Sequence, residues 1–174
     1  MTAALRAGRC AADDPLEDTA RHAARRVAAS VPRHARAFSD TTRRTSDTAA
    51  ALGLSPTPDP ALADLDLGGW TGRDLMDLPV GQVAAWIADP SATPHGGESV
   101  LDLLERVGGW LHRVAALPGR TVAITHPAVV RAVVVVALDA NPESFWRIDV
   151  PPLTSTGLHA HGGRWALRHA CLPL

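Results

Sequence analysis

The sequence contains no lysine and no tyrosine, so all 17 of its basic side chains are arginines. A Schiff-base lysine, a pyridoxal phosphate anchor and the lysine of a phosphate-binding loop each need an amine that arginine does not supply. Enzymes that depend on one of these groups are therefore excluded.

Cysteines are few and long apolar runs are missing. Cys10 and Cys171 lie near opposite ends without a CxxC or metal-like spacing, so no disulfide framework is expected. The apolar run 132–138 is far below the roughly 20 residues that span a bilayer. Residues 1–10 lack the apolar core of a signal peptide. We expect a cytoplasmic protein without a membrane partner.

The balance of charge points to a small ligand. The 174 residues carry a formal net charge of -1 and are 46% hydrophobic, and the arginines are scattered along the chain. A nucleic-acid face is therefore not expected, and one domain over residues 1–174 is the simplest organisation. No cofactor is implied. The oligomeric state stays open, a homo-oligomer included.

Hydrophobic periodicity predicts alternating strands and helices. The expected strands are 2–5, 35–39, 121–125, 147–150, 157–161 and 165–169. The expected helices are 16–30, 41–52, 98–117 and one that begins at Pro127. Such alternation predicts an α/β fold with a mainly parallel sheet, and ligands bind such sheets beyond the carboxyl ends of the strands. Residues 6–10, 39–44 and His126 are therefore the first candidates for a site.

Five segments in order resemble motifs of the histidine phosphatase, or phosphoglycerate-mutase-like, superfamily. They are the first helix at 16–24, SDTTRRTSDTA at 39–49, LADLDLGGWTG at 62–72, PHGGES at 94–99, and the late strand and helix at 121–134. Each motif is weak alone, but their order is specific. The resemblance implies a three-layer α/β/α sandwich, mostly parallel, with an antiparallel edge strand.

The resemblance also implies roles for single residues. Arg44 matches the phosphate-binding arginine, Asp64 stands where the family has a proton-donating glutamate, and His126 matches the second catalytic histidine. Ser39 and Glu98 lie in matching segments and are expected near the anion.

The chain departs from the family at its most informative motif. The family begins with Arg-His-Gly, whereas Arg6 is followed here by Ala7, so the phosphate-accepting histidine is absent on this alignment. Asp13 stands at a downstream asparagine position and adds negative charge. Pro127 follows His126 and lacks the N–H that could help to hold an oxyanion.

The residues themselves support a positive pocket. Arg6, Arg44 and His126 at converging strand ends would attract an anion, because the guanidinium fork suits phosphate and carboxylate oxygens alike. A helix N-terminus favours neutral imidazole, which can act as a base. The alternatives are surface ion pairs for the arginines, a structural role for the histidine, and Asp66 in place of Asp64.

Other side chains have weaker claims to a function. Cys10 could supply a thiolate beside Arg6, although a small apolar filler is the alternative. Trp70 is a candidate for the pocket mouth. His159 and His161 share a strand face, but no third ligand is evident, so no metal is expected.

Three functions follow from these observations. The first is an enzyme that binds an anionic metabolite and transfers protons through Asp64 and His126 without a phosphoenzyme. The second is an inactive pseudophosphatase that serves as a binding module. The third is a phosphomonoesterase that uses Cys10 or a directly activated water. The substrate stays open in all three.

Overall fold

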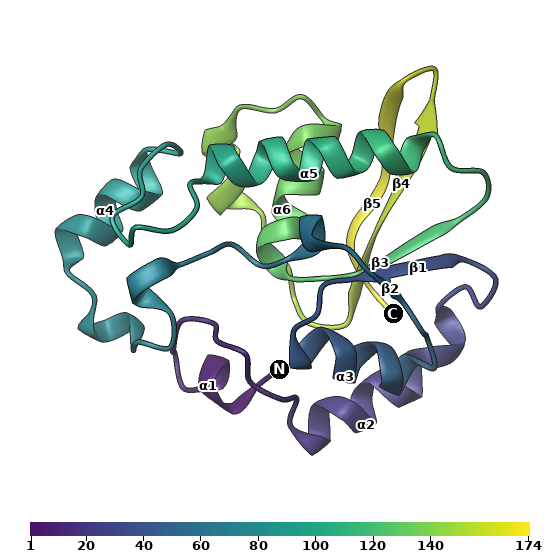
Figure 1. Ribbon diagram of the computed structural model, residues 1–174, viewed down its shortest axis with the longest axis horizontal. Coiled ribbons are helices and arrows are strands. Elements are labelled where there is room, and N and C mark those ends of the chain that lie inside the picture. The colour runs from purple at the N-terminus through teal and green to yellow at the C-terminus, as the bar shows by residue number, and fades with distance from the viewer.

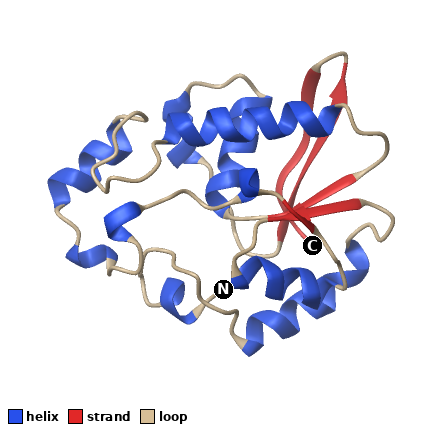
Figure 2. Cartoon of the chain, in the orientation of Figure 1, coloured by secondary structure: helices blue, strands red, loops and turns tan.

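A short parallel sheet lies between two pairs of helices in the computed structural model, which describes residues 1–174. The strand order is β2-β1-β3, with α2 and α3 on one face and α5 and α6 on the other (Figure 1). A separate antiparallel pair, β4 and β5, lies beside it (Figure 2). The predicted α/β/α sandwich, mainly parallel with antiparallel strands at one side, is confirmed.

The elements alternate along the chain in the predicted way. The strands are β1 (Arg36–Ser39), β2 (Thr57–Pro58), β3 (Thr121–Ile124), β4 (Thr154–His161) and β5 (Arg164–Pro173). The helices are α1 (Ala3–Arg6), α2 (Asp18–Val27), α3 (Arg43–Leu52), α4 (Val80–Ala88), α5 (Val100–Ala115) and α6 (Pro127–Ala137). Short 3₁₀ turns are η1 (Ala28–Ser30), η2 (Pro60–Leu62), η3 (Gly68–Trp70), η4 (Leu75–Asp77) and η5 (Pro142–Arg147).

Local signals explain several of these boundaries. Gly53 ends α3 in the left-handed conformation, with φ 73°, which glycine adopts without strain. Ser99 begins α5 through a capping box with Asp102. Pro127 occupies the first turn of α6, where its missing N–H costs nothing. The predicted helices near these residues are thus confirmed, within two residues at each end.

The prediction of a strand at residues 2–5 is wrong, because this segment forms α1. The Oγ1 atom of Thr2 accepts a hydrogen bond from the Leu5 N–H at 3.3 Å and caps the helix. The residues that follow Thr2 are alanine, leucine and arginine, which rank among the best helix formers. The predicted strand at 147–150 is also wrong, since the chain there leaves η5 without pairing.

The parallel sheet and the antiparallel pair share no ladder of backbone hydrogen bonds. β3 pairs with β1 on one side only, and β4 pairs with β5 on one side only. Each of the two strands therefore keeps one edge without a ladder of backbone hydrogen bonds.

The main core lies between α5 and α6. Leu103 and Val107 of α5 and Val129 and Ala132 of α6 are fully buried there, and Phe145 of η5 closes the end. Each large apolar side chain in such a position contributes about 1.5–3 kcal/mol by leaving water. This packing fixes the start of α6, and with it the position of His126.

No helix of the chain combines the length and the apolar composition needed to cross a membrane.

Candidate active site

Two adjacent strand ends bring the central residues together. β1 and β3 run parallel, and their last residues, Ser39 and Ile124, are paired in register. The segments that follow therefore leave the sheet at the same level. His126 is the N-cap of α6 after β3, and Arg44 lies in the first turn of α3 after β1.

Arg44 is the centre of the cluster. Its Nε donates to Nδ1 of His126 at 3.0 Å, and its Nη2 donates to Oδ2 of Asp64 at 2.7 Å. Its Nη1 donates to the carbonyl oxygen of Ala12. The Arg44 side chain is only 11% exposed. Arg44, Asp64 and His126, three residues from distant parts of the sequence, are thus brought together as expected.

The hydrogen bonds define the tautomer of His126. An arginine can only donate, so Nδ1 accepts the bond from Arg44 and carries no proton. The other nitrogen, Nε2, is then protonated and donates to Oδ2 of Asp40 at 2.9 Å. His126 is therefore held as neutral imidazole with both ring nitrogens engaged, and its side chain is 2% exposed.

Asp40 belongs to the same cluster, although the sequence did not predict it as a site residue. Burial by itself would raise the pKa of Asp40, but hydrogen bonds from His126, Thr45 and Thr42 outweigh it and hold the pKa below its ordinary value. Ser39 donates to the backbone oxygen of Asp40 and takes no other part in the cluster. Its position directly after β1 puts Asp40 at the same sheet edge as Arg44, but only the pairing of β1 with β3 brings it to His126.

The lowered pKa of Asp40 predicts a specific acid sensitivity. Its stabilising contribution is complete above the unfolded pKa of about 3.9 and is lost as the pH falls through the lower folded value. As the pH decreases below about 4, we expect the free energy of unfolding to fall less steeply in Asp40→Asn than in the wild type. Urea titrations at several pH values would measure this. The exposed Asp77→Asn should keep the wild-type slope, and equal slopes in all three proteins would contradict the assignment.

The loop that carries Asp64 is fixed by a partly buried arginine. Arg106 of α5 binds both carboxylate oxygens of Glu98, at 2.8 and 2.7 Å, and also donates to the carbonyl oxygens of Ala61 and Ala63. Glu98 therefore does not face the anion site as expected. Its role in this structure is to hold Arg106 against the residues that precede Asp64.

Two loops meet closely beside Asp64. The Glu98 N–H donates to the Asp66 carbonyl oxygen at 2.9 Å, and the Gly69 N–H donates to that of His95 at 2.9 Å. A Cβ atom on Gly97 would lie 2.8 Å from the carbonyl carbon of Asp66. Asp66 itself accepts from the Gly68 N–H and has no contact with Arg44. The structure thus favours Asp64 over Asp66 as the acidic group of the cluster.

Arg6 and Ala7 do not join the cluster. The Arg6 guanidinium pairs with Glu17 and is 61% exposed, and Ala7 is the exposed C-cap of α1. Placing Arg6 in the pocket is therefore wrong, because the strand that should have carried it is a short helix. For the same reason, Arg6-Ala7-Gly8 does not end a strand as its alignment with the family motif requires.

The weaker candidates also have structural roles. Cys10 is 4% exposed, and burial raises the pKa of its thiol more than nearby Arg73 lowers it, which argues against a thiolate. Trp70 is 3% exposed and packs with Cys10 away from solvent, so it does not line a pocket mouth. Asp13 accepts a hydrogen bond from the Arg43 N–H at 2.6 Å, at the N-terminus of α3.

Metal ligands do not gather in this structure. His159 and His161 are exposed on β4, and no group of three histidine, cysteine, aspartate or glutamate side chains is placed to hold an ion.

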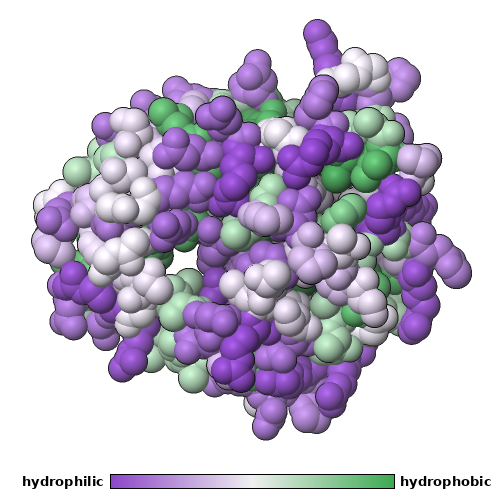
Figure 3. All heavy atoms as spheres, in the orientation of Figure 1, coloured by the Kyte–Doolittle hydropathy of each residue, from purple (hydrophilic) through white to green (hydrophobic).

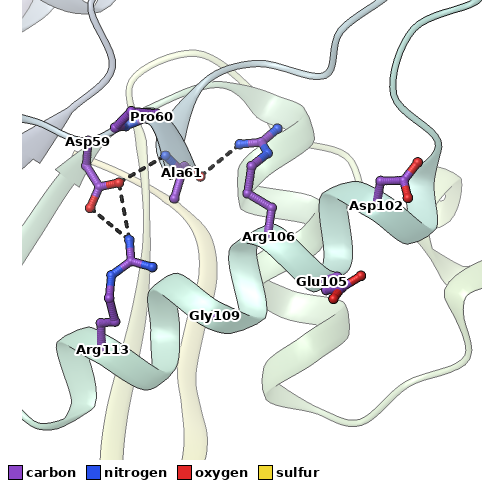
Figure 4. Close-up of a pocket in the computed structure, with 8 residues that line it drawn as sticks. All are labelled: Asp59, Pro60, Ala61, Asp102, Glu105, Arg106, Gly109 and Arg113. Atoms are coloured by element: carbon purple, nitrogen blue, oxygen red, sulfur yellow. Dashed lines mark hydrogen bonds and ion pairs between the residues drawn. The ribbon is translucent and has the colours of Figure 1, made fainter.

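A surface cavity lies elsewhere, between η2 and one side of α5. Its volume is about 610 Å³, and its lining is mostly charged (Figure 4). Arg113 pairs there with Asp59, and Arg106 reaches Ala61. No residue of the cavity belongs to the Arg44 cluster, and its two arginines already have protein partners.

Solvent reaches the cluster from the side of Asp64. The space-filling view shows an opening through the molecule (Figure 3). In Figure 1, the segment after α1 lies on one side of this position, and the stretch between β2 and α4 lies on the other. That stretch carries Asp64, whose side chain is 22% exposed. Of the three clustered side chains, Asp64 is thus the most exposed, ahead of Arg44 at 11% and His126 at 2%.

Known proteins match the chain over most of its length. The family model of the histidine phosphatase superfamily (branch 1) matches residues 4–172. The solved mycobacterial glucosyl-3-phosphoglycerate phosphatase Rv2419c, in complex with VO3, has a TM-score of 0.85 and 25% identity, over 99% of this chain and 94% of that chain. The protein TTHB049 from Thermus thermophilus has a TM-score of 0.77 and 30% identity, over 100% of this chain and 95% of that chain.

A further match is to part of a longer protein. The bifunctional protein Rv2228c of Mycobacterium tuberculosis is 31% identical over 121 residues, which are 66% of this chain and 33% of that protein. The chain thus spans about a third of the length of this curated relative.

Proposed function

Because the chain belongs to branch 1 of the histidine phosphatase superfamily, we propose that it binds the oxyanion of a small phosphate- or carboxylate-bearing metabolite at Arg44. Asp64 and His126 then transfer protons, and no phosphohistidine forms. One observation carries the proposal: the Arg44 guanidinium contacts both ionisable side chains at once. The relative Rv2419c, named a phosphatase and solved with VO3, supports an oxyanion as the ligand.

Asp64 occupies the position that the anion would take. Its carboxylate accepts from Nη2 of Arg44 at 2.7 Å, as a phosphate or carboxylate oxygen of a ligand would. An incoming oxyanion therefore competes with Asp64 for this donor. The displaced carboxyl group remains beside the ligand, where it can give a proton to a leaving oxygen or take one from an attacking group.

His126 becomes a base when Arg44 moves toward the ligand. In the resting arrangement its Nδ1 lone pair is occupied by the Arg44 Nε–H. Once that bond is broken, Nδ1 can accept a proton, and the Asp40 carboxylate on Nε2 stabilises the imidazolium that results. The roles proposed for Asp64 and His126 thus both depend on the same movement of Arg44.

A phosphoenzyme is not proposed, because the cluster offers no free nucleophile. His126 is the single histidine of the cluster, and both of its ring nitrogens are engaged. The Cys10 thiol, outside the cluster, is buried with a raised pKa. A phosphoryl group found on His126 by mass spectrometry would contradict this part of the proposal. Phosphate release from a panel of phosphomonoesters without a phosphohistidine would favour a residual phosphomonoesterase.

A second candidate is an inactive binding module. It is favoured by the fact that all three nitrogens of Arg44 already have protein acceptors, so the resting site is closed. Measurable anion affinity without turnover on any phosphate or carboxylate substrate would favour this candidate over the enzyme.

We expect Arg44→Ala to weaken the binding of inorganic phosphate much more than Arg43→Ala. Arg44 is nearly buried within the cluster, whereas the Arg43 side chain is exposed. Loss of a desolvated, charge-assisted bond should cost about 2 kcal/mol, or roughly thirtyfold in affinity. Isothermal titration calorimetry would measure both variants. Equal losses, or no binding to the wild-type protein, would defeat the proposed site.

A further inference from the structure

We infer that His95 is an acid-sensitive latch, which holds the turn of residues 94–97 against the loop after Asp64 and releases it when the imidazole ring gains a proton. The inference goes beyond the proposed function and stands without it, because it concerns the junction of these two loops. Release of the turn would nevertheless reach the candidate site, since Asp64 directly precedes the loop that the turn contacts.

The ring of His95 is buried within this junction. The residue is 6% exposed, and its ring makes edge-to-face contacts with Trp70 and Trp86, at centroid distances of 5.2 and 5.6 Å. Nδ1 accepts a hydrogen bond from the Gly97 N–H at 3.0 Å. Because that nitrogen accepts, the proton of the neutral ring is on Nε2. Nε2 is itself buried and has no hydrogen-bond partner in the protein.

The bond from Gly97 ties the ring to the contact between the two loops. The residue after Gly97 is Glu98, whose N–H donates to the Asp66 carbonyl oxygen at 2.9 Å. The carbonyl oxygen of His95 accepts from the Gly69 N–H at 2.9 Å. The side chain and the backbone of one residue thus both act at this junction, and the ring does so only while Nδ1 carries no proton.

A protonated His95 does not fit this arrangement. Its Nδ1 would carry a hydrogen that faces the Gly97 N–H, so the bond would be lost and two donors would oppose each other. Nε2 would still lack an acceptor. Burial lowers the pKa of His95 from its ordinary value of 6.5, and the charge of Asp66 offsets only part of this effect. The imidazolium is therefore more stable in water than in the junction.

Few charged groups surround the ring. The elements that supply its aromatic neighbours, η3 and α4, carry no charged side chain. Glu98 follows the turn, but its carboxylate is paired with Arg106 at 2.7 Å. Asp66, in the facing loop, is the carboxylate whose charge acts on His95. Its side chain accepts from the Gly68 N–H and does not contact the ring.

The ring has a cover that is held weakly. Trp86 of α4 packs on one side of it, and no residue of α4 is buried. This helix lies at one end of the molecule (Figure 1). An element with so little buried surface opens at low cost. We therefore expect α4 to move aside and the protonated ring to turn toward solvent, which separates the two loops.

Nuclear magnetic resonance on the unmodified chain tests the latch directly. The His95 ring should titrate with a midpoint below 6.5, and the Gly97 amide resonance should shift with the same midpoint, because protonation breaks the bond between them. A Gly97 amide that does not respond to protonation of the ring would overturn the inference. A ring that stays neutral until the whole protein unfolds would overturn it as well.

Tryptophan fluorescence provides the second measurement, because an imidazolium quenches a neighbouring indole. Among the histidines of the chain, only His95 has its ring in contact with a tryptophan. The wild type should lose fluorescence as the pH falls through the midpoint found by magnetic resonance. The exposed His112→Asn should show the same loss.

Two substitutions at the latch separate its ring from its hydrogen bond. His95→Asn does not titrate, but its side-chain oxygen can accept from the N–H two residues further on, as in an Asx turn. His95→Phe keeps an aromatic ring and removes the acceptor. Both variants should lack the fluorescence loss at acid pH, and His95→Asn should keep the Gly97 amide resonance in its hydrogen-bonded position. If the loss persists in either variant, His95 is not the latch.

Discussion

Asp64→Asn is expected to bind inorganic phosphate about tenfold more tightly than the wild type, because the variant removes the carboxylate that competes for Nη2 of Arg44. The same change should lower turnover of any substrate by roughly 10² to 10⁴, because asparagine cannot transfer a proton. Opposite effects on affinity and turnover are the signature of a group that both occupies the anion position and acts as an acid or base.

The matched control for this experiment is Asp66→Asn. Asp66 lies two residues further along the same loop and caps the Gly68 N–H without touching Arg44. Calorimetry with phosphate, combined with rates on a panel of phosphate and carboxylate metabolites, would compare the two variants. Weaker phosphate binding by Asp64→Asn would show that Asp64 supports the anion site instead of competing for it.

Gly97→Ala is expected to destabilise the fold by about 3 kcal/mol, because the added methyl group cannot be accommodated. It would lie 2.8 Å from both the Asp66 carbonyl carbon and the Gly68 nitrogen, and backbone atoms cannot move aside as a side chain can. In a chain of this size the midpoint of thermal unfolding should fall by about 10 °C. The loop that carries Asp64 would be displaced as well, so phosphate affinity should change with stability.

Gly109→Ala provides the control, since nothing lies within 4 Å of the added methyl group on the exposed side of α5. Replacing glycine by alanine inside a helix usually stabilises it by about 0.5–1 kcal/mol. Calorimetric melting of both variants would therefore show shifts of opposite sign. A Gly97→Ala protein as stable as the wild type would mean that the two loops do not meet as described.

The sequence predicted the parts of the fold that local chemistry decides. The apolar stripe of α5, the glycine after α3 and the proline at the start of α6 are signals that act among neighbouring residues without help from the rest of the chain. The resemblance of short motifs to those of the family implied the grouping of Arg44, Asp64 and His126. For Arg44 and His126, their predicted positions after two strands supported it independently.

The errors arose where a residue's position depends on distant parts of the chain. The segment 2–5 is short and apolar enough to form a strand. Its alanine and leucine residues and the Thr2 cap favour a helix instead, because no neighbouring strand pairs with the segment. The hydrophobic periodicity of the sequence also could not show that Asp40, and not solvent, accepts the hydrogen bond from Nε2 of His126. That partnership depends on the register of β1 against β3, which no local pattern contains.

The free edge of β3 bears on how well its backbone is protected. An unpaired strand edge presents a row of free N–H and C=O groups, and it accepts another extended segment readily. Val122 of β3 packs against the same apolar cluster as Leu153 and Leu174, but these side-chain contacts supply no backbone hydrogen bonds to the free edge. We therefore expect the amide protons of β3 that point away from β1 to exchange with solvent faster than those in the ladder with β1.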